Sequence, residues 1–400
     1  MTQMTGTLPT RAASNARFIG SICAAHFISH YYFMLLPPLF DFVRADYGVS
    51  YTELGLALVC YNVVSAILQT PAGFLIDRVG ARALLIAGLL LGACAVAVAA
   101  LVNSFWVLIV MFGLIGVANT VYHPADYALL SHHTPPERIA KVFSIHTFSG
   151  ILGSAAAPVT MLMMQSLWGW RGAFLGAALL GLAVALLLLV QREPPETVRT
   201  APIETEATAP IGWRLLVTRT ALCNLLFFAL LALTSGGLQY YSVVALGALY
   251  GTPASVANTA LTANLTLSAI GVLAGGYLAT HTTRHASVAV IGSLMVGSAA
   301  LLIAGVNPGS ILLVAAMAVA GFSSGATMPS RDMIVRAVTP PGAFGTVFGF
   351  VATGFNLGGI VTPFVYGLAM DHGQPRAVFL LVAVFSVLTI LTITGTRKRA

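Results

Sequence analysis

The chain has 400 residues, of which 58% are hydrophobic and only 8% are charged, and its formal net charge is +7. Globular proteins carry about 25% charged residues, so this composition excludes a soluble fold that covers its surface with charge. The basic residues lie in short segments between apolar stretches, so the positive balance indicates membrane orientation and not a nucleic-acid partner.

Long apolar stretches recur from Phe18 almost to the C-terminus. Each is long enough for a helix to cross a hydrocarbon core of about 30 Å. The stretches are continuous and do not alternate with polar residues, so they predict an all-α polytopic membrane protein and no β-barrel. The twelve predicted spans are 17–43, 51–76, 82–102, 104–131, 139–166, 171–191, 219–249, 254–280, 286–305, 309–334, 342–369 and 375–394.

The first span is far longer than the core of a signal peptide, so we expect it to remain as a membrane helix. The four cysteines lie within apolar stretches without paired spacing, which predicts small core residues and no disulfide. They are Cys23, Cys60, Cys94 and Cys223.

The basic residues set the expected orientation. With twelve spans both termini lie on one side, and 16 of the 19 Lys and Arg residues then fall on that side or at its edge. The exceptions are Arg44, Arg171 and Arg376. Cytoplasmic loops of membrane proteins are enriched in Lys and Arg. The sequence therefore predicts a multi-pass protein of the inner (cytoplasmic) membrane with both termini in the cytoplasm.

The segment from Gln191 to Trp213 is the longest polar stretch, with four acids and several prolines. Such a composition is typical of a flexible linker. We therefore predict an N-terminal six-helix bundle over 1–191, a cytoplasmic linker over 192–213 and a C-terminal six-helix bundle over 214–400.

The two predicted bundles are related in sequence. TPPERIAKVFSIHTFSGILGSAAAP, from Thr134, aligns with TPPGAFGTVFGFVATGFNLGGIVTP, from Thr339, at an offset of 205 residues. At the same offset Pro124 coincides with Pro329 in the preceding spans. A six-plus-six parallel repeat is the architecture of transporters that rock two bundles about a site near the bilayer midplane.

The segment GFLIDRVGARALL, from Gly73 to Leu85, follows the second predicted span. It resembles the loop motif G-x-x-x-D-R-x-G-x-R of the major facilitator superfamily, and the matching residues are Gly73, Asp77, Arg78, Gly80 and Arg82. The resemblance implies two pseudo-symmetric six-helix bundles and a loop that latches the cytoplasmic side. Gly73 would allow close helix approach, and Asp77 would face a helix N-terminus of the other bundle. The corresponding segment GYLATHTTRH, from Gly276, lacks the acid.

A further resemblance lies in AHFISHYY, VYHPADYALL and SIHTFSGILGSAAAP, which begin at Ala25, Val121 and Ser144. These segments resemble the fosmidomycin-resistance branch of the superfamily, which places a similar histidine in helix 1 and V-aromatic-H-P in helix 4. This chain has His30 where the branch carries an acid. The resemblance implies an efflux transporter.

Ionisable residues lie within four of the predicted spans. At 1.5 Å rise per residue, His26, His30, His123 and Asp126 fall at similar depths, and His146 and Arg331 lie on the same side. Charged groups in hydrocarbon face a cavity or a partner, and histidine changes charge near neutral pH. We therefore predict that the first four residues form a proton-coupling site in a central cavity.

Several alternatives stay open for these residues. Asp126 could act as a gate or packing partner, including in a pair with Arg331, and for His146 a hydrogen bond across helices is favoured over proton coupling. His26 and His30 at positions i and i+4 suit a metal, but no carboxylate or thiolate completes a set at known spacing, so no metal is predicted. Arg331 could attract an anion or pair with Asp332. The GFSSG segment at Gly321 has no preceding strand and predicts no hydrolase nucleophile.

Aromatic and amide side chains on several spans can line a substrate pocket, with interhelical packing or the interfacial belt as the alternative. An aromatic cavity with few fixed charges favours an amphipathic organic molecule of modest size. The candidate substrate-binding residues are Tyr31, Tyr61, Asn62, Asn119, Tyr122, Gln239, Tyr240, Tyr241, Asn356 and Arg331.

We expect a secondary transporter that works by alternating access, through proton-coupled efflux of a small organic molecule by antiport. A proton symporter that imports a small organic anion is the alternative, and a non-transporting sensor or scaffold is a third hypothesis. No nucleotide-binding motif is found, so neither ATP drive nor another cofactor is predicted. The expected partners are the substrate, protons and the bilayer, for a monomeric protein that is not an enzyme.

Overall fold

The computed structural model describes residues 11–191, 193, 216–338 and 344–396, and it is helical throughout this part of the chain. The N-terminal half contains α1 (Arg11–Phe33), η1 (Pro37–Leu39), α2 (Phe40–Tyr47), α3 (Tyr51–Val79), α4 (Ala81–Leu101), α5 (Phe105–His133) and α6 (Pro136–Val190). The C-terminal half contains α7 (Arg219–Gly236), η3 (Gly237–Tyr241), α8 (Ser242–Tyr250), α9 (Ala254–His281), α10 (His285–Gly305), α11 (Gly309–Val338), α12 (Phe344–Thr362), η4 (Pro363–Gly367), α13 (Leu368–Asp371) and α14 (Pro375–Thr396).

The predicted all-α membrane fold is confirmed. Within the described ranges, 10 helical segments are long and apolar enough to span a membrane. The segment that contains α6 holds two spans, because Gly169 interrupts it with φ 70° and ψ 173°, a conformation that favours glycine. The run from α12 through α13 supplies a further span, so the described residues match the predicted order of spans closely.

The first predicted span is interrupted. Helix α1 ends at Phe33, and a short 3₁₀ segment over Pro37–Leu39 leads into α2. Pro37 and Pro38 have no backbone N–H and cannot continue the hydrogen bonding of an α-helix, which explains the break. The predicted span over 17–43 is present as one apolar stretch, Asn15–Tyr47, which contains two helices joined by a bend.

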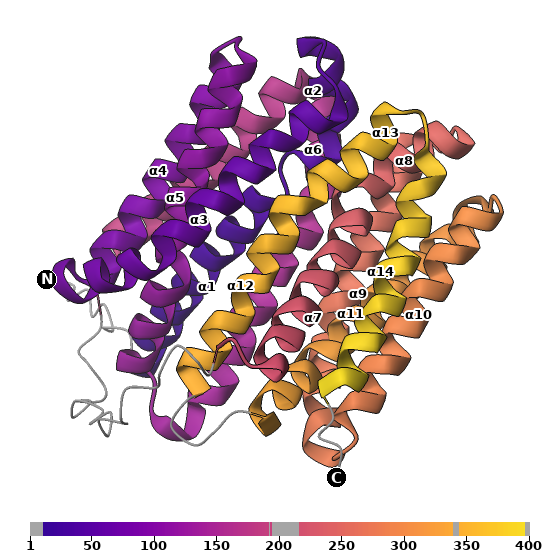
Figure 1. The fold of residues 1–400 in the computed structure, drawn as a ribbon. Coiled ribbons are helices and arrows are strands. Elements are labelled where there is room, and N and C mark those ends of the chain that lie inside the picture. The colour runs from indigo at the N-terminus through magenta and orange to yellow at the C-terminus, as the bar shows by residue number, and fades with distance from the viewer. Residues whose placement is uncertain (1–10, 192, 194–215, 339–343, 397–400) are drawn as a thin grey trace, which may run out of the picture.

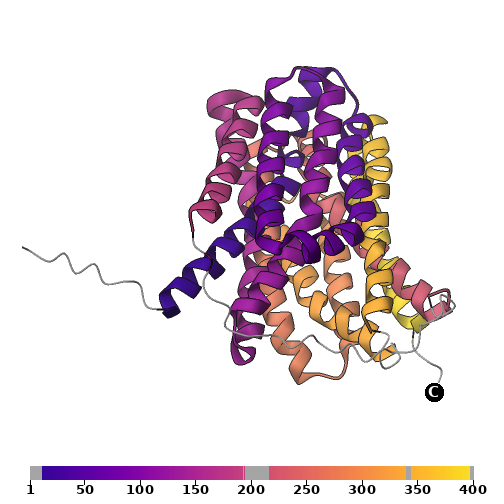
Figure 2. The same cartoon turned by 90° about the vertical axis from the view of Figure 1, so that its left-hand side faces the viewer.

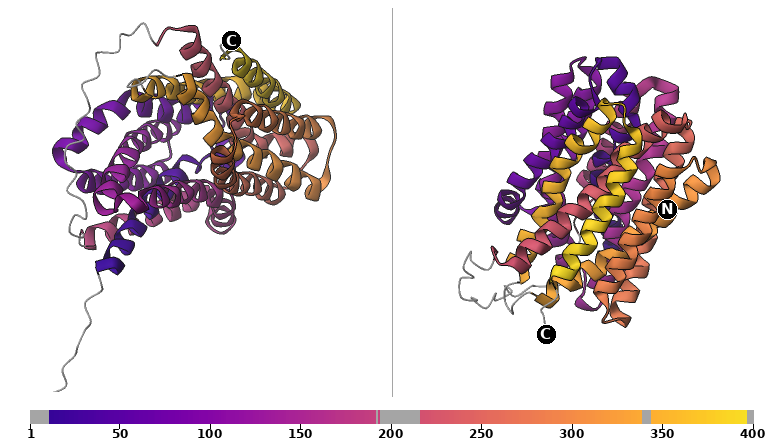
Figure 3. Two further views of the ribbon diagram at one scale, coloured as in Figure 1. Left: turned by 90° about the horizontal axis from the view of Figure 1, so that it is seen from below. Right: turned by 45° about the vertical axis from the view of Figure 1, so that its right-hand side comes forward.

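The helices form two groups that lie side by side (Figure 1). Helices α1 and α3 to α6 pack against one another, and α7 to α14 do the same. The groups meet where α3 contacts α12 and η4 and where α6 contacts α9. Figure 2 shows the face formed by the N-terminal helices, and the view from below in Figure 3 shows the two groups beside each other. Most of the predicted linker over 192–213 lies outside the described residues, so the domain boundaries stay a prediction.

The outer surface is apolar, as a bilayer requires. Large side chains such as Trp106 (69% exposed), Val190 (83%) and Ile311 (89%) point away from the bundles. In water such a surface would be an aggregation hazard, whereas in lipid it carries no penalty because the side chains contact acyl tails.

The two bundles touch closely at the end of the molecule where α2, α8 and α13 lie, the upper end of Figure 1. There the Asp371 carboxylate accepts hydrogen bonds from the backbone N–H groups of Tyr51 (2.7 Å) and Thr52 (2.9 Å) in the other bundle. The ring of Phe40 also lies 5.4 Å from that of Tyr241, measured between centroids. The lower end of Figure 1, where the chain ends, holds the two larger cavities described below.

Candidate functional site

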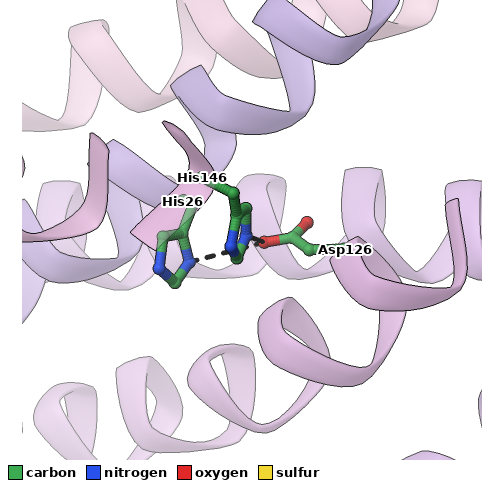
Figure 4. Close-up of side chains that lie close together, drawn as sticks. All are labelled: His26, Asp126 and His146. Carbon is green, nitrogen blue, oxygen red and sulfur yellow. Dashed lines mark hydrogen bonds and ion pairs between the residues drawn. The ribbon is translucent and has the colours of Figure 1, made fainter. Parts of the chain in front are cut away.

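A buried acid–imidazole cluster lies where α1, α5 and α6 meet. Oδ2 of Asp126 on α5 lies 2.9 Å from Nε2 of His146 on α6, in a hydrogen bond, and 3.4 Å from Nδ1 of His26 on α1. The three side chains point toward one another (Figure 4). Asp126 and His146 have no exposed surface, and His26 is 2% exposed. A buried carboxylate is costly unless it is paired, and the two imidazoles supply the partners of Asp126.

Two further histidines extend the cluster. The His26 ring stacks on the His146 ring, with centroids 3.8 Å apart, and contacts the edges of His30 (4.7 Å) and His123 (4.9 Å). His30 and His123 are partly exposed. The structure therefore brings together the four residues that were predicted as the proton-coupling site and adds His146 to them.

Close approach of α1 to α6 makes the cluster possible. A Cβ atom at Gly150 would lie 2.5 Å from Cδ2 and Nε2 of His26, and one at Gly153 would lie 2.1 Å from the carbonyl oxygen of Phe27. Both distances are shorter than any real contact, so only glycine fits at these positions. The two glycines of the SIHTFSGILGSAAAP segment in the predicted fifth span thus have a direct structural cause.

Donor atoms of His26, Asp126 and His146 all lie within 4.8 Å of one another, which would also suit a metal ion. Shared protons between a carboxylate and imidazoles require the same spacing. The expectation of no metal here stays a prediction.

For His146 the sequence favoured a hydrogen bond between helices, and the structure shows one, from α6 to Asp126 on α5. Its ring faces the Asp126 carboxylate, because His146 and Gly150 lie one turn apart on the side of α6 that packs against α1. The glycine four residues later was the signal that could have placed His146 on this face. Tyr127, which no sequence pattern singled out, packs beside the cluster, 5.4 Å from His146 and 4.9 Å from Phe143 between ring centroids.

Arg331 does not pair with Asp126 in this structure. Its guanidinium donates to Asp332 (Nε to Oδ1, 2.8 Å) and lies over the rings of Phe228 and Phe355 at 4.6 and 5.0 Å. The sequence left open whether Arg331 binds an anion or pairs with Asp332, and the structure shows the pair with Asp332. The charge of Arg331 is thus already balanced.

Three of the predicted substrate-binding residues on α1 and α3 have packing roles here. Tyr31 is 1% exposed and its hydroxyl lies 2.8 Å from that of Thr160 on α6. The Tyr61 ring packs on Phe33 at 5.2 Å. The Asn62 side chain donates to the carbonyl of Leu58 and lies against α12.

The remaining candidates lie on α5, η3 and α12. Tyr122 is 1% exposed, and Tyr240 packs its ring 5.6 Å from Phe33 across the bundle interface. Asn119, Gln239 and Asn356 are partly exposed. None of these six side chains, including Tyr241 at the upper contact, lines a cavity described below.

The predicted latch loop joins α3 to α4. Gly80 ends α3 with φ +100°, which requires glycine. Arg82 donates from Nη2 to the carbonyls of Leu188 (2.7 Å) and Gln191. It therefore caps the C-terminal end of α6 in its own bundle, and its observed partners are backbone carbonyls and not an acid or a phosphate. A Cβ atom at Gly73 would meet nothing within 4 Å, so the expected close helix approach is not made in this conformation.

Arg78 is exposed, and the Asp77 side chain lies outside the described part of the structure. The latch that these residues would form therefore stays a prediction.

Three cavities among the described residues bear on the site. One of about 810 Å³ lies at the lower end of α3, α4 and α5 and is lined by Arg82, His132, His133 and Glu193 among others. One of about 420 Å³ lies between α6, α9 and α11, and one of about 40 Å³ lies inside the C-terminal bundle beside Arg331. None of the three has a residue of the acid–imidazole cluster in its lining, and His26, Asp126 and His146 are buried in this conformation.

Comparison with known proteins places this geometry in context. The family model described as Major Facilitator Superfamily matches residues 22–252 and 226–399. The uncharacterized MFS-type transporter YqjV of Bacillus subtilis is 26% identical over 377 residues, covering 90% of this chain and 87% of that protein. The fosmidomycin resistance protein of Escherichia coli K12 is 22% identical over 397 residues, covering 96% and 94%.

Among solved structures, a bacterial homologue of the human lysosomal transporter Spinster, in an inward-facing and unoccupied conformation, aligns with a TM-score of 0.77. It covers 99% of this chain and 100% of that chain at 16% identity, so the likeness concerns the fold alone.

Proposed function

The chain belongs to the major facilitator superfamily and is a multi-pass membrane transporter of small substrates, and from that premise we propose that it is a proton-coupled efflux antiporter. In this proposal the two six-helix bundles, joined by the segment over 192–213, rock about a central site in the inner membrane. The acid–imidazole cluster binds the proton that drives the cycle.

The observation that carries the proposal is the buried pair of Asp126 and His146. One proton shared by a carboxylate and an imidazole leaves the pair without net charge, whereas its loss leaves a buried anion. Oδ1 of Asp126 and Nδ1 of His146 are also buried and have no hydrogen-bond partner among the described residues. Buried polar atoms are almost always paired, so two orphaned atoms in one ion pair indicate a place for water or a proton carrier.

The closure of the cluster supports a gated proton site. His26, Asp126 and His146 are buried, whereas His30 and His123 at its edge are partly exposed. A proton can thus reach the carboxylate only when the packing around the edge histidines changes. Alternating access needs this property, because a site open to both sides at once would leak protons.

The test uses purified protein in liposomes with the variants Asp126→Asn and His146→Gln. We expect both to lose transport driven by a pH gradient and to retain exchange without a gradient, because only the proton site is changed. His372→Gln is the matched control, since His372 is an exposed histidine whose Nδ1 contacts only its own helix. Full pH-driven transport by both cluster variants would refute the assignment.

The same liposomes test direction. An antiporter accumulates cargo when the external side carries fewer protons than the lumen, whereas a symporter accumulates it under the opposite gradient. The alternative of an importer for a small organic anion would need a free cation, and the pairing of Arg331 with Asp332 weakens it. Binding without flux under either gradient would indicate a sensor or scaffold.

A further inference from the structure

The cavity of about 420 Å³ lies between the two bundles. Its lining combines Phe143, Thr147, Phe148 and Ile151 of α6 with residues of α9 and with Pro329 of α11. We call this cavity the α6–α9 crevice. Because α6 belongs to one bundle and α9 and α11 to the other, a ligand in the crevice would contact both moving parts.

The lining of the α6–α9 crevice holds no acidic, basic or imidazole side chain. Its polar groups are the hydroxyls of Ser144, Thr147 and Tyr277, and the remainder is aromatic, aliphatic or glycine. The larger cavity at the lower end of α3 differs, since it includes Arg82 and Glu193. A charged ligand in the crevice would find no counter-charge in the lining, which disfavours it.

The size of the crevice fits a small organic molecule. Ligand sites commonly measure about 300 to 1,000 Å³, are mostly apolar and hold a few polar groups that set orientation. The crevice has this volume and this composition. None of the residues that the sequence predicted for substrate binding lines it.

The crevice also reaches the acid–imidazole cluster through two aromatic rings. Phe143 lines the crevice and packs against Tyr127, with ring centroids 4.9 Å apart. Tyr127 in turn lies 5.4 Å from His146 and 6.4 Å from His123. A ligand against Phe143 would therefore restrict a ring that touches two histidines of the proposed proton site.

We propose that the α6–α9 crevice binds the cargo and that this cargo is an uncharged, amphipathic organic molecule. The inference rests on the proposed function, because it names the substrate class of the same carrier. Phe143 and Tyr127 connect cargo binding to the cluster, so that an occupied crevice holds the cluster closed until the bundles move.

The test is a binding measurement without any gradient, so it does not depend on proton coupling. Gly276→Leu adds a side chain to the lining, and a Cβ atom at Gly276 meets nothing within 4 Å, so the helix can accept it. Gly20→Leu is the matched control, because Gly20 is also a helical glycine with open space around its Cβ position, away from the crevice. Val272→Phe is a second filling variant for the case that the first does not fold.

The probes are chloramphenicol as an uncharged amphipathic compound, benzoate as an anion and tetraphenylphosphonium as a cation. Binding of each probe is measured by thermal shift and by equilibrium dialysis. We expect chloramphenicol to bind the wild type and Gly20→Leu and to bind Gly276→Leu or Val272→Phe at least tenfold more weakly. Unchanged binding in both filling variants, or binding only of a charged probe, would overturn the proposal.

Two more outcomes would also overturn it. One is the absence of chloramphenicol binding to the wild type. The other is binding in detergent that disappears in lipid nanodiscs, which would show that acyl chains fill the crevice. Failure of the proton proposal alone would leave these binding results unchanged, so the two failures can be told apart.

Discussion

Asp371 joins the two bundles at the upper end, and its loss should open that end. Both oxygens of its carboxylate accept from the first two backbone N–H groups of α3, those of Tyr51 and Thr52. The next donors of this helix are satisfied within the N-terminal bundle, since Glu53 N–H donates to the Ser50 hydroxyl. The first four N–H groups of a helix have no partner inside it, so the opposite bundle supplies two of the required acceptors.

The expected effect follows from these contacts. A carboxylate at a helix N-terminus contributes about 0.3 to 1 kcal/mol when exposed, and hydrogen bonds to charged groups contribute more when shielded. Asp371 is exposed, so we take about 1 to 2 kcal/mol for the two bonds together. These bonds exist only while the upper end is closed. Asp371→Asn should therefore shift the equilibrium toward the conformation open at that end by roughly 5- to 30-fold.

Spin labels at Val102→Cys and Ser255→Cys report the opening. Both positions lie at the upper end, one in each bundle: Val102 directly follows α4, and Ser255 lies in the first turn of α9. In a background without the native cysteines, Asp371→Asn should increase the population with the longer distance. Asp46→Asn is the matched control, because Asp46 pairs with Arg171 inside one bundle at the same end. An unchanged distance distribution, or an equal change in the control, would refute the reasoning.

Two further predictions concern the N-terminal bundle. Gly150→Val places a side chain where the His26 ring lies, since that ring is 2.5 Å from the added Cβ. The substitution should displace the ring and reduce pH-driven transport at least tenfold. The measurement is flux in liposomes at equal protein content. Arg82→Gln removes the charged donor to the carbonyls of Leu188 and Gln191 and should lower the free energy of unfolding by about 1 to 3 kcal/mol. This loss would appear as a lower midpoint in thermal unfolding. Exchange without a gradient should be retained. Wild-type thermal stability of the arginine variant would show that the end of α6 does not need this cap.

Apolar run length and turn residues were sufficient to predict the helices. The observed α3, α5 and α9 begin or end within a few residues of the predicted spans, because hydrocarbon thickness fixes their length. The interruption at Pro37 was the main departure. A proline pair signals a kink, but its sequence does not show whether the helix bends or stops.

The candidate site was predicted only in part, because depth follows from sequence position but rotation does not. His26, His123 and Asp126 were placed at one level, and the structure brings them together. The partner of Asp126 was missed, since His146 lies on another helix whose facing side is set by contacts of Gly150 and Gly153 with α1. Tertiary packing decides such rotations, and one sequence holds little information about them.

Alternating access also limits how strongly either end can close. If the contacts at the upper end stabilised one conformation by much more than those at the lower end stabilise the other, a single state would be populated and transport would stop. The upper end is held by Asp371 on the N-terminus of α3, whereas Gly73 in the C-terminal part of the same helix has no close neighbour in this conformation. The predicted latch with Asp77 would use the same interaction, a carboxylate on a helix N-terminus of the opposite bundle. Because one kind of contact would close both ends of α3, the two conformations can have similar free energies, and a proton or a cargo molecule is then sufficient to decide between them.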